Sequence, residues 1–469
     1  MSIDIASKQK NLALKAKERP NERIGNLYSI IDKEWIEQAL WNVLQNTGAK
    51  TEGIDGKVKG IYYDSANRKP TSEGKELVDE ICKELKEITY KPQPVKRIYI
   101  PKANGKMRPI GIPTIKDRVV QEAIRMVIEP IFESDFLKCS HGFRPNRNTM
   151  DAIAGCYRMI NTQVKYYWVI EGDIKGCFDN IDHKILMKLI RNRIADRKLT
   201  DTIYKCLKAG YQEDGRIHKS DRGTPQGGII SPLLANIFLH EFDKWWKENY
   251  YLDAKTRLIR RKKGQGNFYL IRYADDFIIL SNGTKEATCE MKEKVAKFLE
   301  EMKLELSEEK TKVTHANDGF DFLGFHIRKF KGIKSVLIRP TRANKQKLRD
   351  KIGMILDRRN QKYAVTDAIK AINPVIRGWA NYYRFVNSKE TFNEIQFYIN
   401  NKFIKWYRGK YRMNLQKGTV EALKWINQND LHIYGMSVET KVKRYILKAS
   451  NENPYIEGKI DRGAENPFS

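Results

Sequence analysis

The chain has 469 residues, of which 87 are Lys or Arg and 58 are Asp or Glu, so its formal net charge is +29. This length allows about two to four domains with sizeable cores. Hydrophobic residues make up 41% and charged residues 31%, which excludes a chain that is disordered throughout. The excess of positive charge indicates a polyanionic partner, either nucleic acid or an anionic membrane surface, and argues weakly against an enzyme that acts on small metabolites alone.

Neither the apolar segments nor the cysteines indicate membrane insertion or secretion. The densest apolar segment, 229–239, is shorter than the roughly 18 apolar residues of a membrane span and is interrupted by Ser231, Pro232 and Asn236. The N-terminus lacks the apolar core of a secretory signal. The six cysteines are scattered singly without a C-x-x-C pair, which excludes a Cys-based zinc module and suits a reducing compartment. We therefore expect a cytoplasmic protein that does not bind membranes.

Helical patterns precede a region of mixed strands and helices. Within the basic and polar residues 1–90, apolar side chains recur at helical spacing over 35–44 and 74–87. From Val95 onward strands appear, beginning with a hairpin at Asn104-Gly105, because Asn-Gly between β-prone runs favours a type I′ turn. Further along, the patterns predict strands over 166–173, 268–280 and 320–338, and helices over 117–136, 232–246 and 285–302.

Residues beyond Pro340 show only helical patterns, in the stretches 348–355, 369–383 and 392–406. Lys and Arg outnumber Asp and Glu by 17 to 5 over 341–416, a net charge of +12. A basic helical face alone is most simply a solvated surface, but aromatic residues between the cations favour nucleic-acid binding, because bases stack on rings while phosphates pair with cations. The candidate RNA-binding residues are Arg377, Trp379, Tyr382, Tyr383, Arg384, Lys405 and Arg408, with Trp406 and Tyr407 beside them.

The remaining residues, 417–469, read as a small helical piece followed by a polar tail that we expect to be mobile.

The candidate chemistry centres on RYADDFIIL, where Asp275 and Asp276 lie between two apolar half-strands. Alone, this string is most simply a solvated turn. A second apolar strand ends at Asp173, which is free for chemistry if Asp179 and Asp182 cap the following helix. If the two strands are neighbours in one sheet, their carboxylates converge. Such a cluster repels itself unless cations neutralise it, and hard oxygen ligands favour two Mg²⁺ ions of the kind used in nucleotidyl transfer.

An ordered set of motifs from about residue 91 to residue 411 resembles the group II intron-encoded reverse transcriptases, also called maturases. The block PQGGIISPLL separates this resemblance from diversity-generating relatives, and the lack of a Val-Thr-Gly string speaks against retron enzymes. The matching blocks are RPIGIPTIKDRVVQEAI, HGFRPNRNTMDAI, GDIKGCFDNIDH, RGTPQGGIISPLLANIFLHEFD, RYADDFIIL, LSEEKTKV and FDFLGFHI, followed by INPVIRGWANYYRFV in the maturase segment.

The resemblance implies an α+β right-hand polymerase, with fingers and palm, followed by an all-helical thumb. Residues 1–90 would form an N-terminal extension and the start of the fingers, and 91–339 the fingers and palm. Residues 340–416 would form the helical thumb, or maturase domain, and 417–469 a small DNA-binding segment with a flexible tail.

The resemblance also implies the catalytic set. Asp173, Asp275 and Asp276 would form the metal triad of the palm, with two Mg²⁺ ions, or Mn²⁺ in their place, bridged by Asp173 and Asp275 and assisted by the Ile174 carbonyl. Lys310 is a weaker candidate near this site.

Four residues would contact the incoming dNTP. Phe178 falls where the family places the aromatic that blocks a ribose 2′-OH, although its residue type alone suggests a core phenylalanine. Lys102 and Arg108 flank the hairpin turn that would hold the triphosphate, and cations there suit a Mg-phosphate site, although each alone is most simply surface charge. Gln226 would line the nucleotide and template pocket.

The string FLGF resembles the primer grip, whose glycine permits close approach of the backbone. Its residues are Phe322, Leu323, Gly324 and Phe325.

One departure from the family pattern is the lack of the C-terminal HNH endonuclease with paired cysteines that many members carry. We therefore expect no DNA-cleaving activity from this chain, and expect second-strand priming to come from elsewhere. By resemblance, the protein would act in a bacterial cell in association with the nucleoid.

Three functions stay open at this point. The leading hypothesis is an RNA-directed DNA polymerase that binds its intron RNA, promotes splicing, and copies the intron from an RNA template and DNA primer at a DNA target, using dNTPs. The second is a non-catalytic RNA-binding splicing maturase, which the intact Asp173, Asp275 and Asp276 set argues against. The third is a host-adopted reverse transcriptase in repair or defence, which intron sequence flanking the coding region would exclude.

Overall fold

The computed structural model describes residues 3–101, 105, 107–161, 163–225, 227–333, 335–429, 431 and 453–457. Its N-terminal helices pack around one long helix, α5 (Ile115–Asp135), which begins at its cap Thr114 and is buried along most of its length. Trp35 fixes α2 (Lys33–Gln45) to α5, because its buried indole N–H donates to the Ala123 carbonyl at 3.0 Å. The other elements here are α1 (Ile3–Glu18), η1 (Tyr28–Ile30), η2 (Thr47–Lys50), α3 (Lys59–Tyr62), β1 (Tyr63–Asp64), β2 (Lys69–Pro70) and α4 (Ser72–Glu87).

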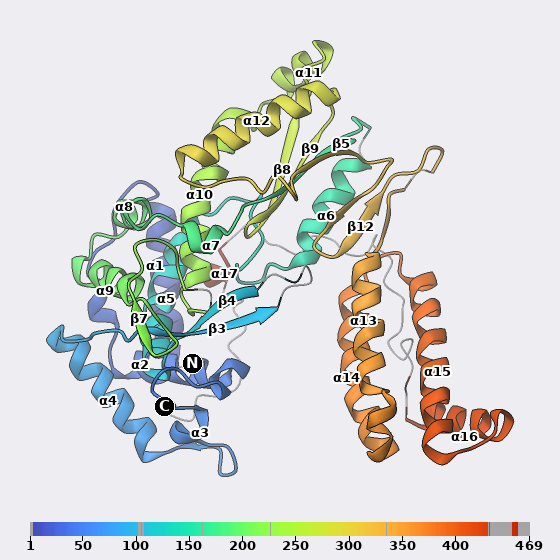
Figure 1. Ribbon diagram of the computed structural model, residues 1–469. Coiled ribbons are helices and arrows are strands. Elements are labelled where there is room, and N and C mark those ends of the chain that lie inside the picture. Colours follow the sequence, from blue (N-terminus) through green and yellow to red (C-terminus); the bar gives the residue numbers. More distant parts are fainter. Residues whose placement is uncertain are drawn as a thin grey trace.

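A four-stranded sheet projects from these helices (Figure 1). Its central hairpin confirms the predicted pair of strands, β3 (Val95–Pro101) and β4 (Met107–Ile112). Turn residues 102–104 and 106 lie outside the described residues. The short β6 (Tyr211–Glu213) joins β3 in parallel, and β7 (Arg216–His218) completes the sheet.

The central sheet has the strand order β10-β5-β9-β8, with every neighbouring pair antiparallel. Successive residues of β9 alternate between two hydrophobic cores: Phe277 and Ile279 face the core that contains α5 and α10, whereas Ile278 and Leu280 face the core that contains α6. Burial on both faces explains the uninterrupted apolar run of this strand. The strands are β5 (Trp168–Asp173), β8 (Phe268–Tyr273), β9 (Asp276–Ser281) and β10 (Lys312–His315).

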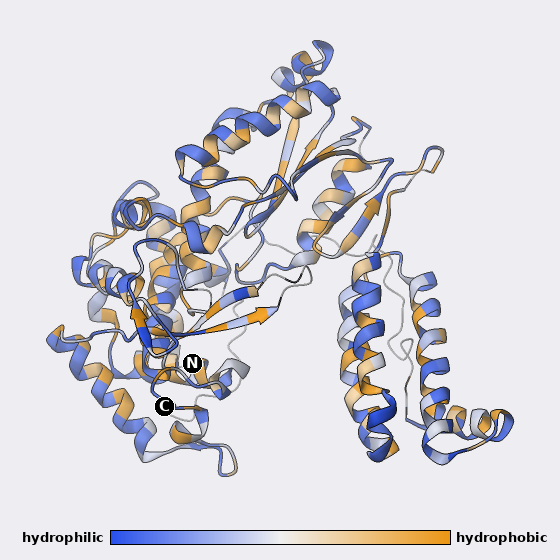
Figure 2. Ribbon diagram, viewed as in Figure 1, coloured by the Kyte–Doolittle hydropathy of each residue, from blue (hydrophilic) through white to orange (hydrophobic). Residues whose placement is uncertain are grey.

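Helices cover both faces of this sheet. Hydrophobic residues run along β8 and β9 in Figure 2, whereas α4 and α12 alternate hydrophobic and hydrophilic residues, as helices with one solvated face do. The helices of this region are α6 (Thr149–Ile160), α7 (Cys177–Asn180), α8 (His183–Arg193), α9 (Arg197–Lys208), α10 (Ser231–Tyr250), α11 (Ala254–Lys262) and α12 (Lys285–Glu301).

A small three-stranded sheet leads into a helical bundle, which stands beside the rest of the molecule in Figure 1. The second hydrophobic core runs from the central sheet through this small sheet into the bundle, so the two parts share one buried surface. The predicted helices beyond Pro340 are confirmed. The elements are β11 (Phe320–Phe322), β12 (Phe325–Arg328), β13 (Leu337–Pro340), α13 (Arg342–Ile355), η3 (Arg358–Lys362), α14 (Val365–Tyr383), α15 (Lys389–Tyr411) and α16 (Leu415–Gln428).

Two expectations about the C-terminal half are wrong. Residues 453–457, the described part of the tail that we expected to be mobile, are docked: α17 (Pro454–Glu457) contacts α1, and the buried Tyr455 hydroxyl donates to Glu129 of α5. Residues 451, 452 and 458–469 of this tail lie outside the described residues. In the bundle, Tyr383, Trp406 and Tyr407 are buried. Aromatic residues spaced along amphipathic helices fill the bundle core here, so these three rings offer no free face for stacking.

None of the helices within the described residues has the length and apolar character that a membrane crossing requires.

Candidate active site

The sheet brings the three predicted aspartates to one end. Asp173 is the last residue of β5 and pairs directly with Asp276, the first residue of β9. Asp275 precedes it in the tight β8–β9 turn, which we call the catalytic hairpin (residues 272–276). The preceding Ala274 has a positive φ of 58°. The sequence predicted that the carboxylates converge if the two strands are neighbours in one sheet, and β5 and β9 are such neighbours.

The electrostatics of this end reflect the crowding of negative charge. The Asp276 side chain reaches the surface, yet surrounding protein and the neighbouring Asp275 and Asp173 raise its pKa to about 7. Burial, followed by the Asp173 charge, also raises the pKa of Asp275. In each case the charged form is disfavoured because carboxylates lie close together with little solvent between them.

Lys310 supplies positive charge to this cluster. Its Nζ lies 2.8 Å from Asp173 Oδ2, and the hydrogen bond to Asp173 raises the pKa of the lysine. The loop that carries Lys310 is itself attached to the site: the Ser307 N–H donates to the Asp173 carbonyl at 2.8 Å, and the Lys310 N–H donates to the Ser307 carbonyl. Lys310, the weaker candidate in the sequence, therefore binds Asp173 directly.

A buried ion pair that sequence reasoning missed supports the catalytic hairpin. The fully buried Arg272 binds both carboxylate oxygens of Asp243 on α10, at 2.8 and 2.5 Å. The same guanidinium donates to the Ala274 carbonyl at 3.0 Å and to Ser140 Oγ at 2.8 Å. Both charged residues stand inside recognised blocks, RYADD and HEFD, but neither block shows that they are partners.

The HGF loop packs against the same turn. A Cβ on Gly142 would lie 2.4 Å from the Ala274 nitrogen, so only glycine fits there. The Gly142 carbonyl accepts a bond from the Asn236 side chain at 2.8 Å, and the His141 N–H donates to the Arg272 carbonyl at 2.9 Å. Residues from three separate motifs, HGF, SPLLAN and RYADD, are therefore in contact at this one turn.

Asp182 caps α8, because its side chain accepts bonds from the N–H groups of residues 184 and 185. Asp179 lies inside α7 and is not a cap; the residue before α7 is Gly176, which has a positive φ of 55°. Ile174 is buried, and its N–H donates to the Asp275 carbonyl at 3.4 Å.

The predicted nucleotide contacts fall partly within the described residues. Phe178 on α7 is half-buried and meets the exposed Phe143 edge-on, with ring centroids 6.1 Å apart, so it is not an enclosed core residue. Arg108 is exposed on β4, and its charge lowers the pKa of Asp275. Lys102 and Gln226 lie outside the described residues.

The FLGF string forms the tight β11–β12 turn, which we call the grip hairpin (residues 322–325). Phe322 and Phe325 are buried, while Leu323 and Gly324 both have positive φ, at 50° and 82°. Two adjacent tyrosines of α14 hold this turn: the Tyr382 hydroxyl donates to the Leu323 carbonyl at 2.9 Å, and the Tyr383 hydroxyl to the Gly324 carbonyl at 3.1 Å.

These bonds change the interpretation of both tyrosines. The Tyr382 ring also stacks on Phe325, with centroids 5.2 Å apart. Tyr383 is 2% exposed, which corrects its prediction as a stacking residue for RNA. Of the remaining candidates, Arg377 and Lys405 are exposed, and Trp379, Arg384 and Arg408 are half-buried.

The donor chemistry of the aspartate cluster fits a divalent metal ion, because hard carboxylate oxygens are the ligands such ions prefer. Burial and neighbouring carboxylates raise the pKa values of both Asp275 and Asp276, which indicates negative charge that Lys310 alone does not balance. Throughout the described residues, no three His, Cys, Asp or Glu side chains converge on a single metal position. The match between the aspartate cluster and a divalent metal ion therefore rests on the type of ligand atom and on the negative charge.

Comparison with known proteins gives two family matches that divide the chain as the fold does. Residues 100–327 match the reverse transcriptase (RNA-dependent DNA polymerase) family, and residues 345–424 match the group II intron, maturase-specific domain. The first range contains the central sheet and the aspartate cluster, and the second lies in the helical bundle.

Individual relatives agree with this division. Protein YkfC of Escherichia coli is 38% identical over 344 residues, which cover 69% of this chain and 88% of that protein. Group II intron-encoded protein LtrA of Lactococcus lactis is 35% identical over 459 residues, covering 81% of this chain and 73% of LtrA. A telomerase structure from Candida albicans covers 77% of this chain and 66% of its own, at 14% identity and a TM-score of 0.39.

The matches cover both the sheet domain and the helical bundle, and the aspartates stand at the end of the sheet as the resemblance implied. The chain belongs to the group II intron-encoded reverse transcriptases and maturases, and is an RNA-directed DNA polymerase that carries a group II intron maturase domain.

Proposed function

We propose that Asp173, Asp275 and Asp276 hold two Mg²⁺ ions and catalyse DNA synthesis from dNTPs on an RNA template. Reverse transcriptases depend on divalent metal ions. The observation that carries the assignment to these residues is the direct pairing of Asp173 with Asp276, beside Asp275, at one end of the central sheet. When bound there, the ions would activate the primer hydroxyl and neutralise the leaving pyrophosphate.

The residues around the aspartates would position the substrates. Arg108, whose charge reaches Asp275, and Lys102 would bind the triphosphate. Phe178 would lie against the sugar and exclude a 2′-OH, and Gln226 would contact the nucleotide and template. Lys310 would exchange its bond with Asp173 for one with substrate phosphate as the metal ions take over the neutralisation of the carboxylates.

The grip hairpin, residues 322–325, would hold the primer terminus. A turn with two consecutive residues of positive φ leaves its backbone close to the surface, and its carbonyls are fixed by the thumb tyrosines. Primer position would therefore depend on the palm and the thumb together.

The helical bundle would bind intron RNA, assist its splicing, and bring the polymerase to a DNA target where the intron is copied. Support comes from the maturase-domain match over residues 345–424 and from the excess of 17 Lys and Arg over 5 Asp and Glu in 341–416. The exposed Arg377 and Lys405 are the contacts we favour. Binding of this kind weakens with salt, because each phosphate contact releases counterions.

The test is primer extension on an RNA template with dNTPs and Mg²⁺, comparing the wild type with Asp275→Ala. We expect the substitution to lower the rate by at least about 1,000-fold, because removing a metal ligand removes electrostatic stabilisation of the transition state. Affinity for the intron RNA should be unchanged, since RNA binding is assigned elsewhere. Polymerisation that survives the substitution would refute the site. The matched control is Asp321→Ala, which removes an exposed aspartate from β11 of the three-stranded sheet.

A further inference from the structure

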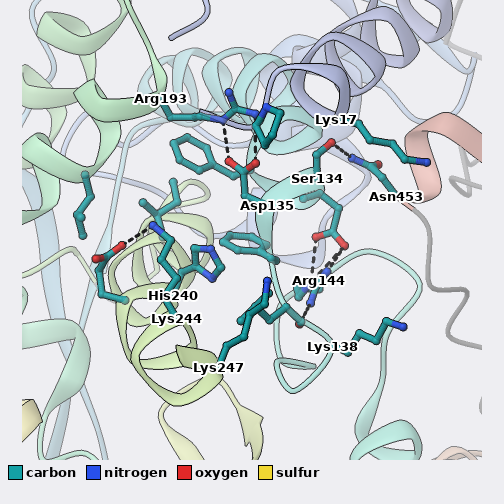
Figure 3. Close-up of a pocket in the computed structure, with 18 of the residues that line it drawn as sticks. Lys17, Ser134, Asp135, Lys138, Arg144, Arg193, His240, Lys244, Lys247 and Asn453 are labelled. Carbon is teal, nitrogen blue, oxygen red and sulfur yellow. Dashed lines mark hydrogen bonds and ion pairs between the residues drawn. The ribbon is translucent and has the colours of Figure 1, made fainter. Parts of the chain in front are cut away.

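A large cavity is lined by His240, whose ring lies next to Asp243 of the buried Arg272–Asp243 pair. Its volume is about 880 Å³, within the range of ligand pockets. The C-terminal end of α5, the loop that follows it, and the helices α1, α8 and α10 contribute its walls (Figure 3). Nothing in the polymerase site described above uses this space.

The floor of the cavity is made of buried ion pairs. Arg144 and Glu133 are each 3% exposed at the side chain and lie 2.6 Å apart. Arg193 binds Asp135 at 2.8 Å, and Figure 3 marks this pair with dashed lines. These cations are neutralised by their partners, so they shape the cavity rather than attract a ligand.

The rim carries positive charge that is not neutralised. Seven Lys or Arg side chains and four Asp or Glu side chains line the cavity, which leaves a net charge of 7 − 4 = +3. Lys17, Lys138 and Lys247 are exposed, and among the described residues none of them has an ion-pair partner. Figure 3 shows these three lysines among the residues that line the cavity.

Arg147 and His240 also line the cavity. The pKa of Arg147 is lowered to about 10 by burial and by the adjacent Arg144. His240 is 7% exposed and packs edge-on against Phe136, with ring centroids 5.4 Å apart. Its Nδ1 makes no hydrogen bond within the described residues and lies 3.8 Å from Asp243 Oδ2. Neighbouring cations, such as Arg147 and Arg144, are surroundings in which a bound anion is stabilised.

We propose that this cavity binds a phosphate-bearing ligand of nucleotide size, either a free nucleoside polyphosphate or one nucleotide of an RNA strand. Lys17, Lys138, Lys247 and Arg147 would pair with the phosphates, and the Phe136–His240 pair would meet the base or sugar. The two sources share the same phosphate chemistry, so the experiment separates them.

The experiment is isothermal titration of the full chain with two probes, ATP and an oligoadenylate RNA of eight residues, in EDTA so that the polymerase site lacks its metal. The test variant is Lys138→Ala/Lys247→Ala. The matched control is Lys285→Ala/Lys294→Ala, which removes the same charge from the exposed face of α12. We expect the test variant to bind about tenfold more weakly, because two exposed cation–phosphate contacts are lost, and the control to match the wild type.

Each outcome decides the proposal. A cavity-dependent loss with ATP supports a free nucleotide, and a loss with the RNA alone supports a strand. Equal affinities in the test and control variants overturn the proposal, as does binding of ATP that disappears in Arg108→Ala but persists in the test variant. The charge-retaining Lys138→Arg/Lys247→Arg variant should restore binding, and equal thermal unfolding midpoints show that the fold is intact.

Discussion

The catalytic hairpin and the grip hairpin are both tight β-turns with residues of positive φ, yet they are held by different chemistry. In the first, the carbonyl of Ala274 is bound by a fully buried Arg272 that is itself paired with Asp243. In the second, the carbonyls of Leu323 and Gly324 are bound by neutral tyrosine hydroxyls from α14.

The two supports also come from different parts of the molecule. Arg272 and Asp243 belong to the central sheet and the helix that covers it, so the catalytic hairpin is fixed within one rigid unit. The tyrosines belong to the thumb, so the grip hairpin is correctly placed only when the thumb is docked. Under the proposed function, this arrangement would keep the carboxylates independent of thumb position and would make primer placement depend on it.

The largest effect is expected from Arg272→Met, which removes the charged support of the catalytic hairpin. The substitution leaves Asp243 buried without a partner and frees the Ala274 carbonyl, so we expect a loss of about 3–5 kcal/mol in the free energy of unfolding. Urea-induced unfolding measures this loss. Lys244→Met, which removes an exposed pair with Glu241, is the control and should cost less than about 1 kcal/mol. Similar small losses in both variants would mean that the buried pair is not a structural support.

A smaller effect is expected from Gly324→Ala in the grip hairpin. The backbone has a φ of +82°, and a Cβ would lie 2.4 Å from Asn344 Nδ2 and 3.1 Å from the Tyr383 hydroxyl. We expect a loss of about 1–2 kcal/mol in the free energy of unfolding, together with weaker primer binding. Gly378→Ala on α14 has open space around its Cβ and should be neutral or slightly stabilising. A neutral Gly324→Ala variant would show that the turn has room to adjust.

The mildest test removes only the two hydroxyls, in Tyr382→Phe/Tyr383→Phe. Each lost hydrogen bond should cost about 0.5 kcal/mol, or about 1 kcal/mol for the two together. In primer extension the KM for primer–template should rise several-fold while kcat at saturation stays close to that of the wild type, because the aspartates are untouched. Tyr398→Phe, which loses a hydroxyl bond to the Arg349 carbonyl inside the thumb, is the control. A fall in kcat with unchanged KM would contradict the separation of the two hairpins.

Sequence patterns predicted most of the local structure for physical reasons that act within short segments. Apolar periodicity predicted the thumb helices, and the apolar half-strands around Asp275 and Asp276 predicted a hairpin. The ordered motifs predicted the family, which the domain matches confirm. The convergence of Asp173 with Asp276 was conditional on strand pairing, because periodicity does not reveal which strands are neighbours.

Tertiary structure alone decided which polar and aromatic residues are partners. Arg272 and Asp243 are 29 residues apart, and Tyr382 and Leu323 are 59 apart, so no local pattern joins them. The same limit explains two wrong expectations: Tyr383 fills the thumb core, and Tyr455, expected in a mobile segment, docks against α5. The order of the motifs was enough to predict the family, and residue types were enough to propose which side chains do the chemistry. Only packing of distant segments decided how those residues are held, because burial and long-range hydrogen bonds exist only in the folded chain.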